Sequence, residues 1–473
     1  MRYIAKKFIG SREFEGEYRE IVSPYSGEVV SKYVICSRED AKEALKVAKK
    51  AFENTKKSPL HQRISWLEDV ASKLKEQKEE FALMITTEVG KPISQSRIEV
   101  QRCIENIELC AKELINLHGE TISTDATISG FKTEAFYKRV PAGVVVAITP
   151  FNFPLNLVAH KIAPALGAGN SVVLKPTPEA PYTAYAFAKL FIESRFAIQD
   201  ALSVVYGDAE VGSELVSNFI PRIISFTGSV PVGKIITQNA GIKKVALELG
   251  GNAATYIEGS ADLEKAAKRC AIGAFSNSGQ VCISLQRIYV DSNIYEEFAQ
   301  KLAEESKKLV VGDPFNEETF MGPLINKESV ERAKSWVDSA IQEGARLIAG
   351  GEVKSGNVFT PTILADVTDD MNVVCQEVFA PIVSLVKVET FDEAVEKINN
   401  SPYGLQFSIF TNRIDLMKRA IDEFEAGGVV INDIPTLRFD IQPYGGYKLS
   451  GIGKEGPKYA LEEMTEIKSI VIC

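Results

Sequence analysis

Histidine is scarce in this chain of 473 residues, and its cysteines are neither paired nor clustered. The three histidines, His61, His118 and His160, form no metal-like pair. The seven cysteines are widely spaced, odd in number and without a CxxC motif: Cys36, Cys103, Cys110, Cys270, Cys282, Cys375 and Cys473. We therefore expect no zinc or other metal site, no disulfide framework, and a reducing compartment.

Long apolar runs are also missing. No stretch reaches the ~18 apolar residues of a membrane-spanning helix, and the opening residues MRYIAKKFIG lack the apolar core of a signal peptide. Positive charge is in deficit, because 54 Lys and Arg face 63 Asp and Glu, for a formal net charge of −9. An acidic surface argues against nucleic acid or an anionic membrane as the main partner. The chain is therefore predicted to be soluble and cytoplasmic.

The pattern of apolar residues changes twice in the first half of the chain. Residues 38–118 carry apolar residues at helical spacing after Ser37, a candidate N-cap. Residues 120–142 are rich in Thr and Ile and alternate, which predicts two strands with a turn near 129–130. From 143 to 250, short apolar strands such as GVVVAIT alternate with helices. That alternation is typical of βαβ units in a parallel sheet, where ligands bind beyond the carboxyl ends of the strands.

A second alternating stretch covers about 261–435, and the chain ends in the apolar strand TEIKSIVIC. Such a strand needs a partner edge, which we expect to be 120–142 or another subunit. No internal repeat or low-complexity segment interrupts this order. The overall prediction is an α/β fold with more than one domain.

Cys282 lies in FSNSGQVCISLQR, just after Gly279, a residue that lets a loop approach a ligand closely. A thiolate is a strong nucleophile once its pKa is lowered from ~8.5. The alternative is a buried small hydrophobe, which is the usual fate of a free cysteine.

Glu248 ends the apolar strand of VALELGGN, immediately before two glycines. A carboxylate at the carboxyl end of a parallel strand, in apolar surroundings, can have a raised pKa and act as a general base. The alternative is a Glu that caps a helix or forms a salt bridge.

Asn152 lies in ITPFNFP, between aromatic residues and directly after a predicted strand. Its side-chain amide could donate to an oxyanion. The alternative is a loop Asn that caps the following helix.

Two glycine motifs are candidate phosphate sites. SFTGSVPVG (225–233) reads as strand, turn and helix start, so free N–H groups there could bind an anion. A perfect GxGxxG at 451–456 follows polar residues near the end of the chain and leaves no room for a βαβ unit. We interpret the second motif as a structural loop.

Taken together, these segments resemble the aldehyde dehydrogenase superfamily. The motifs PFNFP, VVLKPT, FTGS, LELGG, GQVC, EVFAP and PYGGYKLSGIGKEG occur in the order of that family and cover essentially the whole chain. The match is closest to the branch of lactaldehyde, glyceraldehyde, succinate-semialdehyde and non-phosphorylating glyceraldehyde-3-phosphate dehydrogenases. The resemblance implies a Rossmann-like NAD(P)-binding domain (1–119 and 143–250), an α/β catalytic domain (251–435) and a bridging β element (120–142 and 436–473). It also implies a homodimer or homotetramer.

The resemblance implies roles for individual residues. Cys282 matches the nucleophile, Glu248 the base that deacylates it, and Asn152 the side-chain donor of the oxyanion hole. Lys175 in VVLKPT matches a lysine on the adenosine ribose, and Glu377 in EVFAP a glutamate on the nicotinamide ribose. The full set expected to bind the nucleotide is Ile148, Thr149, Pro150, Phe151, Lys175, Pro178, Gly207, Phe226, Thr227, Gly228, Ser229, Val232, Leu249, Glu377 and Phe379.

Cofactor choice depends on one position. Many NAD-preferring members have a glutamate three residues after the lysine, where this chain has Pro178, and the glutamate follows at Glu179. Loss of a close carboxylate relaxes discrimination against the 2′-phosphate, so we favour NADP, or use of both nucleotides. The alternative is that Glu179 reaches the ribose.

Members acting on glyceraldehyde 3-phosphate often place an arginine before the nucleophile, and Val281 stands there in this chain. A phosphorylated substrate is therefore disfavoured. The residues expected to surround the substrate are Asn156, His160, Val281, Ile283 and Arg438, whose polar members could bind a hydroxyl or carboxylate. A helix cap, a core histidine and a solvated arginine are their alternative interpretations.

Three other functions fit parts of this sequence. A CoA-acylating dehydrogenase would typically lack Glu248. A cysteine hydrolase without nucleotide would need a histidine partner such as His160 and would leave Lys175 unexplained. A non-catalytic protein on the same fold need not keep the three catalytic side chains together.

Overall fold

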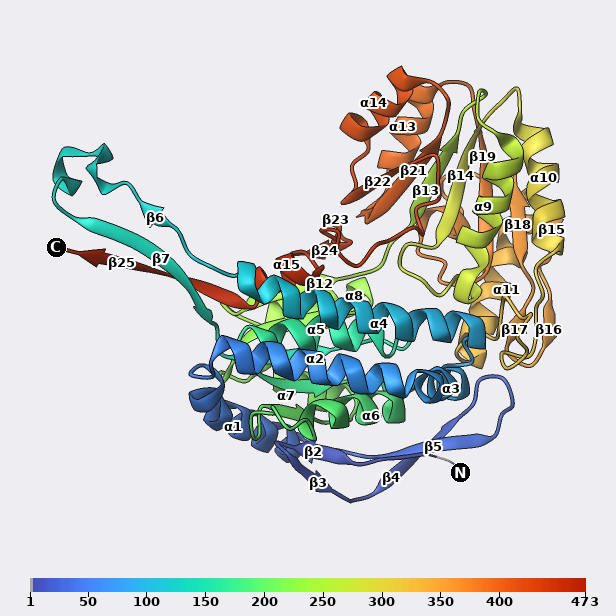
Figure 1. Ribbon diagram of the computed structural model, residues 1–473. Helices are drawn as coiled ribbons and strands as arrows, with labels where there is room; N and C mark the ends of the chain where they lie inside the picture. Colours follow the sequence, from blue (N-terminus) through green and yellow to red (C-terminus); the bar gives the residue numbers. More distant parts are fainter. Residues whose placement is uncertain (1–2) are drawn as a thin grey trace.

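The computed structural model describes residues 3–473, so Met1 and Arg2, the first residues of the predicted nucleotide-binding domain, lie outside the described residues. Two sheet-and-helix bodies lie next to each other, and a β arm extends away from them (Figure 1). The predicted α/β fold class is confirmed. Within residues 3–473, no helix has both the length and the apolar character needed to traverse a bilayer.

The first body is built on an eight-stranded sheet in the order β24-β12-β11-β8-β9-β10-β2-β3. Its strands are β2 (Lys7–Ile9), β3 (Arg12–Phe14), β8 (Val144–Ile148), β9 (Ser171–Lys175), β10 (Leu202–Val204), β11 (Pro221–Thr227), β12 (Lys244–Glu248) and β24 (Gly451–Ile452). The five from β12 to β10 are parallel, and the outer strands are antiparallel. The short strand β24 comes from the GxGxxG segment, which forms no βαβ unit.

Helices cover both faces of this sheet, which is why its central strands read as continuous apolar runs. On one face pack α1 (Arg38–Thr55), α7 (Ala209–Ser217) and α8 (Val230–Asn239). On the other pack α5 (Asn156–Gly167) and α6 (Pro181–Ile192), with α2 (Leu60–Glu76), α3 (Lys78–Val89), α4 (Ile93–Glu113) and α15 (Pro457–Glu463) outside them. The predicted cap at Ser37 is confirmed, because Ser37 and Asp40 form a reciprocal capping box at the start of α1.

The second body has a seven-stranded sheet in the order β15-β18-β19-β14-β13-β21-β22, parallel except for β15. Its strands are β13 (Ala253–Ile257), β14 (Leu285–Asp291), β15 (Arg346–Ala349), β18 (Thr362–Ala365), β19 (Ile382–Val388), β21 (Gln406–Phe410) and β22 (Gly428–Ile431). Helices α9 (Leu263–Phe275) and α10 (Tyr295–Lys307) cover one face. The other face carries α11 (Lys327–Gln342), α12 (Asn372–Cys375), α13 (Phe391–Asn399) and α14 (Ile414–Glu423).

Smaller sheets complete the two bodies. β1 (Tyr3–Ala5) and β4 (Tyr18–Val22) flank β5 (Val29–Val34). Two pairs are formed by β16 (Val353–Ser355) with β17 (Val358–Phe359), and by β20 (Tyr403–Gly404) with β23 (Tyr447–Lys448). The pairing of β20 with β23 holds residues 447–448, which follow the last strand of the seven-stranded sheet, against residues 403–404.

The arm contains β7 (Glu134–Pro141), with β25 (Thr465–Ile472) on one side and β6 (Thr121–Ile122) on the other (Figure 1). The predicted pairing of the terminal strand with 120–142 is confirmed, from Thr465 opposite Pro141 to Ile472 opposite Glu134. The predicted pair of strands in 120–142 is present as β6 and β7, but the first strand is much shorter than the segment predicted to form it. Only two residues of β6 pair, and single 3-10 turns follow at Thr124–Ala126 and Ile128–Gly130. Local bonds, such as that from Thr124 Oγ1 to the carbonyl of Thr133, replace the ladder there.

Candidate active site

The parallel strands of the first sheet end in register, with Ile148 opposite Lys175 and Thr227 opposite Glu248. At this edge a cavity of about 520 Å³ is lined by residues of both bodies. The sequence-predicted residues that line it are Pro150, Phe151, Asn152, Asn156, Thr227, Gly228, Ser229, Glu248, Leu249, Val281, Cys282, Ile283, Glu377, Phe379 and Arg438. Side chains from distant parts of the chain therefore meet at the place expected for a ligand.

The remaining predicted residues are not part of the cavity wall. Ile148, Thr149, Lys175, Pro178 and Gly207 lie at or just beyond the carboxyl ends of β8, β9 and β10. Phe226 is buried in β11, Val232 is exposed in the first turn of α8, and His160 is buried in α5.

Cys282 lies in a loop after α9 whose backbone is unusual. Asn277 and Ser278 adopt left-handed conformations, with φ of 48° and 57°, which are uncommon for residues other than glycine. Gly279 also has a positive φ, and a Cβ there would lie 2.2 Å from the carbonyl oxygen of Ala380. Glycine is thus required at this position. The loop is held by buried hydrogen bonds, such as the one Ser278 donates to the carbonyl of Gly322.

The thiol of Cys282 is partly buried in the cavity wall. Its Sγ lies 3.0 Å from the hydroxyl of Tyr444. Burial raises the pKa of Cys282 to about 11, although the Tyr444 hydrogen bond and the charge of Arg438 lower it. Glu248 and Glu377 raise it further.

Asn152 is hydrogen-bonded to the loop that carries Cys282. Its Nδ2 donates to the carbonyl of Gln280 over 2.9 Å, and the side chain of Asn277 donates back to the carbonyl of Asn152 over 3.3 Å. One of the two amide N–H groups of Asn152 is used in this way, which leaves the other for a ligand. Its Oδ1 is buried and has no hydrogen-bond partner in the part of the chain that the structure describes.

Glu248 ends β12 and is 6% exposed. Its Oε2 is buried without a partner among residues 3–473. Burial, reinforced by the nearby carboxylate of Glu455, raises the pKa of Glu248 well above its usual value. Such a carboxyl group ionises reluctantly and is a strong base once ionised.

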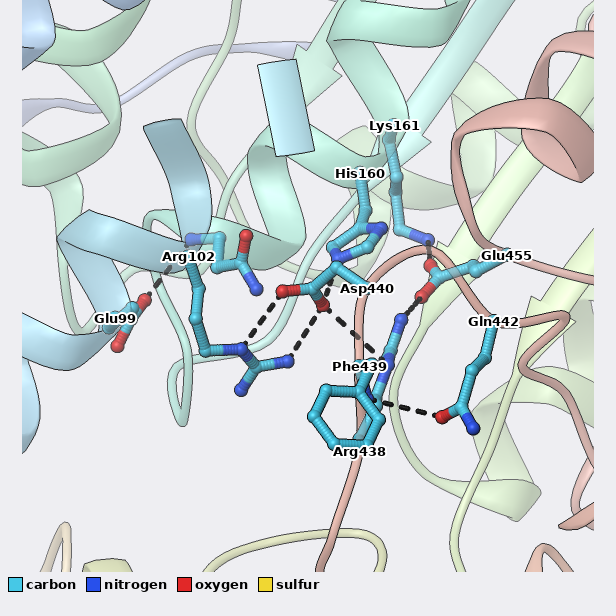
Figure 2. A network of polar contacts seen from close by, with 10 residues as sticks. Glu99, Arg102, His160, Lys161, Arg438, Phe439, Asp440, Gln442 and Glu455 are labelled. Atoms are coloured by element: carbon cyan, nitrogen blue, oxygen red, sulfur yellow. Dashed lines mark hydrogen bonds and ion pairs between the residues drawn. The ribbon is translucent and has the colours of Figure 1, made fainter. Parts of the chain in front are cut away.

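Next to these side chains lies an ion-paired cluster formed by Arg102, His160, Lys161, Arg438, Asp440 and Glu455 (Figure 2). Three of its members, Arg102, Arg438 and Glu455, also line the cavity. The carboxylate of Asp440 accepts from Arg102 in a two-pronged arrangement (2.7 and 2.9 Å), and His160 Nε2 lies 3.0 Å from it. The second carboxylate, Glu455, lies between Lys161 (3.1 Å) and Arg438 (3.2 Å). His160 thus contacts Asp440 and does not line the cavity. Arg438 contacts both Asp440 and Glu455, and it also lines the cavity.

The cations of this cluster lower the pKa values of its two carboxyl groups. Burial opposes ionisation of Glu455, but Lys161, His160 and Arg438 outweigh it and lower the pKa of Glu455 to about 2. Burial also opposes ionisation of Asp440, yet His160 and Arg102 hold the pKa of Asp440 far below its usual range. Both carboxylates are therefore charged at neutral pH.

A second ion pair supports the loop that carries Asn152. The buried carboxylate of Glu99 accepts from the backbone N–H groups of Leu155 (2.9 Å) and Asn156 (3.1 Å) at the start of α5. Its other oxygen pairs with Lys91, whose ammonium group lies 3.8 Å from the centre of the Phe153 ring. Negative charge at a helix start is favourable, so Glu99 fixes this end of α5.

The edge next to this site suits a dinucleotide. Helix α8 starts at the cavity wall after Ser229, so its first N–H groups are available to an anion. A Cβ at Gly228 would lie 2.4 Å from the Phe226 ring, and Thr227 Oγ1 is buried without a partner among the described residues. These features would let phosphate oxygens approach the backbone closely.

Glu377 and Lys175 flank the same edge. The carboxylate of Glu377 accepts from the N–H of Gly251 over 3.0 Å, and burial raises the pKa of Glu377 to about 7. Phe379 has a φ of 47° and meets Phe151 edge to face at 6.1 Å between ring centres. A strained loop at a functional edge is common. Burial lowers the pKa of Lys175.

Sequence reasoning missed several residues of the site: Lys91, Glu99, Arg102, Lys161, Asp440, Tyr444 and Glu455. Lys161 could have been found, because it is the one charged residue of an otherwise mainly apolar helix, and every residue of α5 is buried. A buried lysine needs a partner. Its partner Glu455 has no comparable feature in the sequence around it.

The chain is similar to known proteins over almost its whole length. The sequence profile described as "Aldehyde dehydrogenase family" matches residues 11–470. The chain is 45% identical to a 3-sulfolactaldehyde dehydrogenase of Priestia aryabhattai over 464 residues, which are 98% of this chain and 96% of that protein. It is similar to the crystal structure of aldehyde dehydrogenase 21 from Physcomitrella patens in complex with the reaction product succinate, with a TM-score of 0.97 and 35% identity, covering 100% of this chain and 98% of that one. The glyceraldehyde-3-phosphate dehydrogenase of Methanocaldococcus jannaschii complexed with NADP gives a TM-score of 0.92 and 41% identity, covering 98% and 99%.

Proposed function

The chain belongs to the aldehyde dehydrogenase family, and from that premise we propose that it oxidises a small hydroxylated or anionic aldehyde to the carboxylate with NADP or NAD. Cys282 is the nucleophile and Glu248 the base in this proposal. The observation that carries it is the meeting of Cys282, Glu248 and Asn152 in one cavity, although they are far apart in the sequence. We call these three residues the reactive trio.

The side chains support the following sequence of steps. The Cys282 thiolate attacks the aldehyde carbon, and the carbonyl oxygen becomes an oxyanion. The free N–H of Asn152 and the backbone N–H of Cys282 donate to that oxygen, and one such donor contributes about 3 kcal/mol. A nicotinamide nucleotide held by Glu377 and the first turn of α8 would supply the hydride acceptor for the former aldehyde carbon.

A thioester on Cys282 then remains. Glu248 takes a proton from water while the water oxygen attacks the thioester carbonyl. The C–S bond breaks, the carboxylate product leaves, and Cys282 returns as a thiolate. The raised pKa of Glu248 makes it a strong base for this step.

The proposed substrate class is supported by polar side chains that line the cavity. Asn156 Oδ1 is buried without a hydrogen-bond partner within the described chain, and the guanidinium group of Arg438, although paired with Asp440 and Glu455, brings positive charge to the same wall. An acceptor beside a fixed cation suits a hydroxyl next to an anionic or polar group. The names of the relatives, which include sulfolactaldehyde, agree with such a substrate.

Steady-state kinetics over a panel of aldehydes test this proposal. We expect sulfolactaldehyde, lactaldehyde, glyceraldehyde or succinate semialdehyde to give a higher kcat/KM than a long alkanal. The variant Asn156→Ala should raise the KM of the preferred hydroxylated aldehyde more than that of the alkanal. A preference of the unmodified enzyme for the long alkanal would contradict the substrate class.

For the nucleotide we propose a preference for NADP. The carboxylate of Glu179 accepts from the hydroxyl of Thr177, so it is engaged close to its own backbone. Pro178 offers no charge against a 2′-phosphate. Parallel kcat/KM measurements with NADP and NAD test this, with Glu179→Gln as the matched variant. A clear preference for NAD that Glu179→Gln abolishes would show that Glu179 excludes the phosphate.

We further propose a homodimer or homotetramer in a reducing, cytoplasmic compartment. The outer edge of β25 pairs with no strand among residues 3–473, and Ile467, Val471 and Ile472 of this strand are more than half exposed. An exposed apolar edge strand favours a partner. The seven unpaired cysteines agree with reducing conditions. Light scattering after size exclusion tests the assembly, and a stable monomer would contradict it.

A further inference from the structure

Tyr444 is placed against the nucleophile by the backbone of its own loop. Its N–H donates to the carbonyl of Glu455 over 3.1 Å, and the N–H of Glu455 donates back to the carbonyl of Tyr444. The two residues thus form a short antiparallel bridge. Since Glu455 is itself held by Lys161 and Arg438, the position of Tyr444 is determined by the ion-paired cluster.

The side chain of Tyr444 has little freedom. It is 5% exposed and packs with Val281, Ile283 and Leu405 in a small apolar cluster around Cys282. The guanidinium carbon of Arg438 lies 3.6 Å from the centre of its ring, a favourable cation–π arrangement. The ring is therefore held by Arg438 and by these apolar neighbours, and its hydroxyl lies 3.0 Å from Sγ of Cys282.

The direction of the Tyr444 hydrogen bond depends on which group is ionised. Burial raises the pKa of Tyr444 well above its usual value, so the phenol keeps its proton. A protonated phenol next to a thiolate donates to the sulfur. Hydrogen bonds to charged groups are stronger than those between neutral groups, so the contact favours the thiolate over the thiol.

We propose that Tyr444 is a further catalytic residue, whose hydroxyl donates a hydrogen bond to the Cys282 thiolate and stabilises it before attack. The proposal rests on the proposed function, in which Cys282 is the nucleophile. The thiol proton leaves to water in the cavity, and Tyr444 retains its own proton. Once the sulfur is bonded to carbon it is a weaker acceptor, so the stabilisation acts on the resting enzyme.

Tyr444→Phe is the decisive variant, because it removes only the hydroxyl and leaves the ring under Arg438. We expect the pKa of the Cys282 thiol to rise by about one unit or more, the size of a hydrogen bond to a charged group. The pKa can be read from the thiolate ultraviolet absorbance, with Cys282→Ser subtracted as background. Nucleophilicity rises partly with pKa, so alkylation by iodoacetamide at pH 8 should slow by only about threefold.

Other ionisable groups face the same sulfur: Arg438, Glu248 and Glu377. They remain in both proteins, so the difference between the two titrations isolates the hydroxyl. The matched control is Tyr447→Phe, in the same loop and 53% exposed, which should leave the titration and the alkylation rate unchanged. A Tyr444→Phe thiol that titrates at the same pH as the unmodified enzyme would overturn the proposal.

Failure of this proposal can be told apart from failure of the proposed function. If Cys282→Ser is inactive but Tyr444→Phe titrates normally, only the role of Tyr444 is wrong. If Cys282→Ser keeps its activity, the assignment of the nucleophile is wrong. Thermal unfolding of each variant, together with peptide mapping of the alkylated cysteine, shows that the measured thiol is Cys282 in a folded protein.

Discussion

The reactive trio and the ion-paired cluster are neighbours, but the buried side-chain oxygens of the two regions differ in how many hydrogen-bond partners they have. Asn152 and Glu248 each keep a buried oxygen without a partner among the described residues. In the cluster, Asp440 and Glu455 each accept from two side chains. A buried polar atom without a partner costs ~1–3 kcal/mol. We infer that the unpartnered oxygens lower stability where a substrate or water must bind, whereas the paired carboxylates of the neighbouring cluster stabilise the fold.

The pKa values follow the same division. Burial raises the pKa of Glu248 and Cys282, because no fixed cation compensates it fully. In the cluster, paired cations overcome burial and lower the pKa of Glu455 to about 2. Cys282 and Glu248 thus hold their protons more tightly than usual, whereas Asp440 and Glu455 stay charged. Each prediction below separates the two regions further.

The largest effect is expected for Cys282→Ser. Loss of the nucleophile should lower kcat by ~10⁴-fold or more, as for other covalent catalysts. Affinity for the nucleotide, measured by fluorescence, should change little. Cys375→Ser is the control, because Cys375 is also partly exposed but lies outside the cavity wall. Equal losses in both variants would contradict the assignment.

Glu248→Gln should slow hydrolysis of the thioester by ~10²–10³-fold, the range of a general base. A rapid burst of reduced nucleotide should precede slow turnover, and mass spectrometry should find the acyl group on Cys282. Because the pKa of Glu248 is raised, hydrolysis in the unmodified enzyme should accelerate as pH rises through that pKa, and the variant should lose this dependence. A variant that shows no burst would argue against Glu248 as the base for deacylation.

Much of the reactive trio was predictable, because strand ends and glycine turns have local signatures. The βαβ rhythm places Glu248 and Asn152 at carboxyl ends of strands, and the family match confirms the predicted aldehyde dehydrogenase family, fold class and enzyme class. The need of the apolar terminal strand for an edge left 120–142 and another subunit as options, and the structure shows the first, with Thr465–Ile472 paired to β7.

The ion-paired cluster was not predictable in the same way. Lys161 and Glu455 are 294 residues apart, and Arg102 and Asp440 are 338 apart. No periodicity links such positions, and apart from Lys161 each charged residue alone resembles a solvated charge. His160 was weighed both as a substrate contact and as a core histidine, and only the packing of α5 against the final loop shows that it bonds to Asp440. Tyr444 was missed for the same reason.

Within the cluster, Glu455→Gln should destabilise the protein at pH 7 by ~3–5 kcal/mol, because it leaves buried cations without their carboxylate. The folded-state pKa of about 2 lies below the unfolded value of ~4.3. Glu455 therefore contributes its stability above pH ~4.3 and loses it as pH falls toward 2. Over that window the unmodified protein should lose ~3 kcal/mol that the variant does not. Urea midpoints at pH 3, 5 and 7 measure this, and parallel curves would contradict it.

Glu377→Gln should show the opposite slope with a smaller amplitude, because Glu377 is partly exposed. Its folded-state pKa of about 7 lies above the unfolded value of ~4.3, so its contribution to stability is lost as pH rises between these values. The variant without nucleotide should match the unmodified protein at pH 4 and exceed it at pH 8. Glutamine still accepts from Gly251, so packing is preserved. A higher KM of Glu377→Gln for the nucleotide would show that the carboxylate serves binding at the expense of stability. If Glu377→Gln and Glu455→Gln changed the dependence of stability on pH in the same direction, the difference between the two regions would be contradicted.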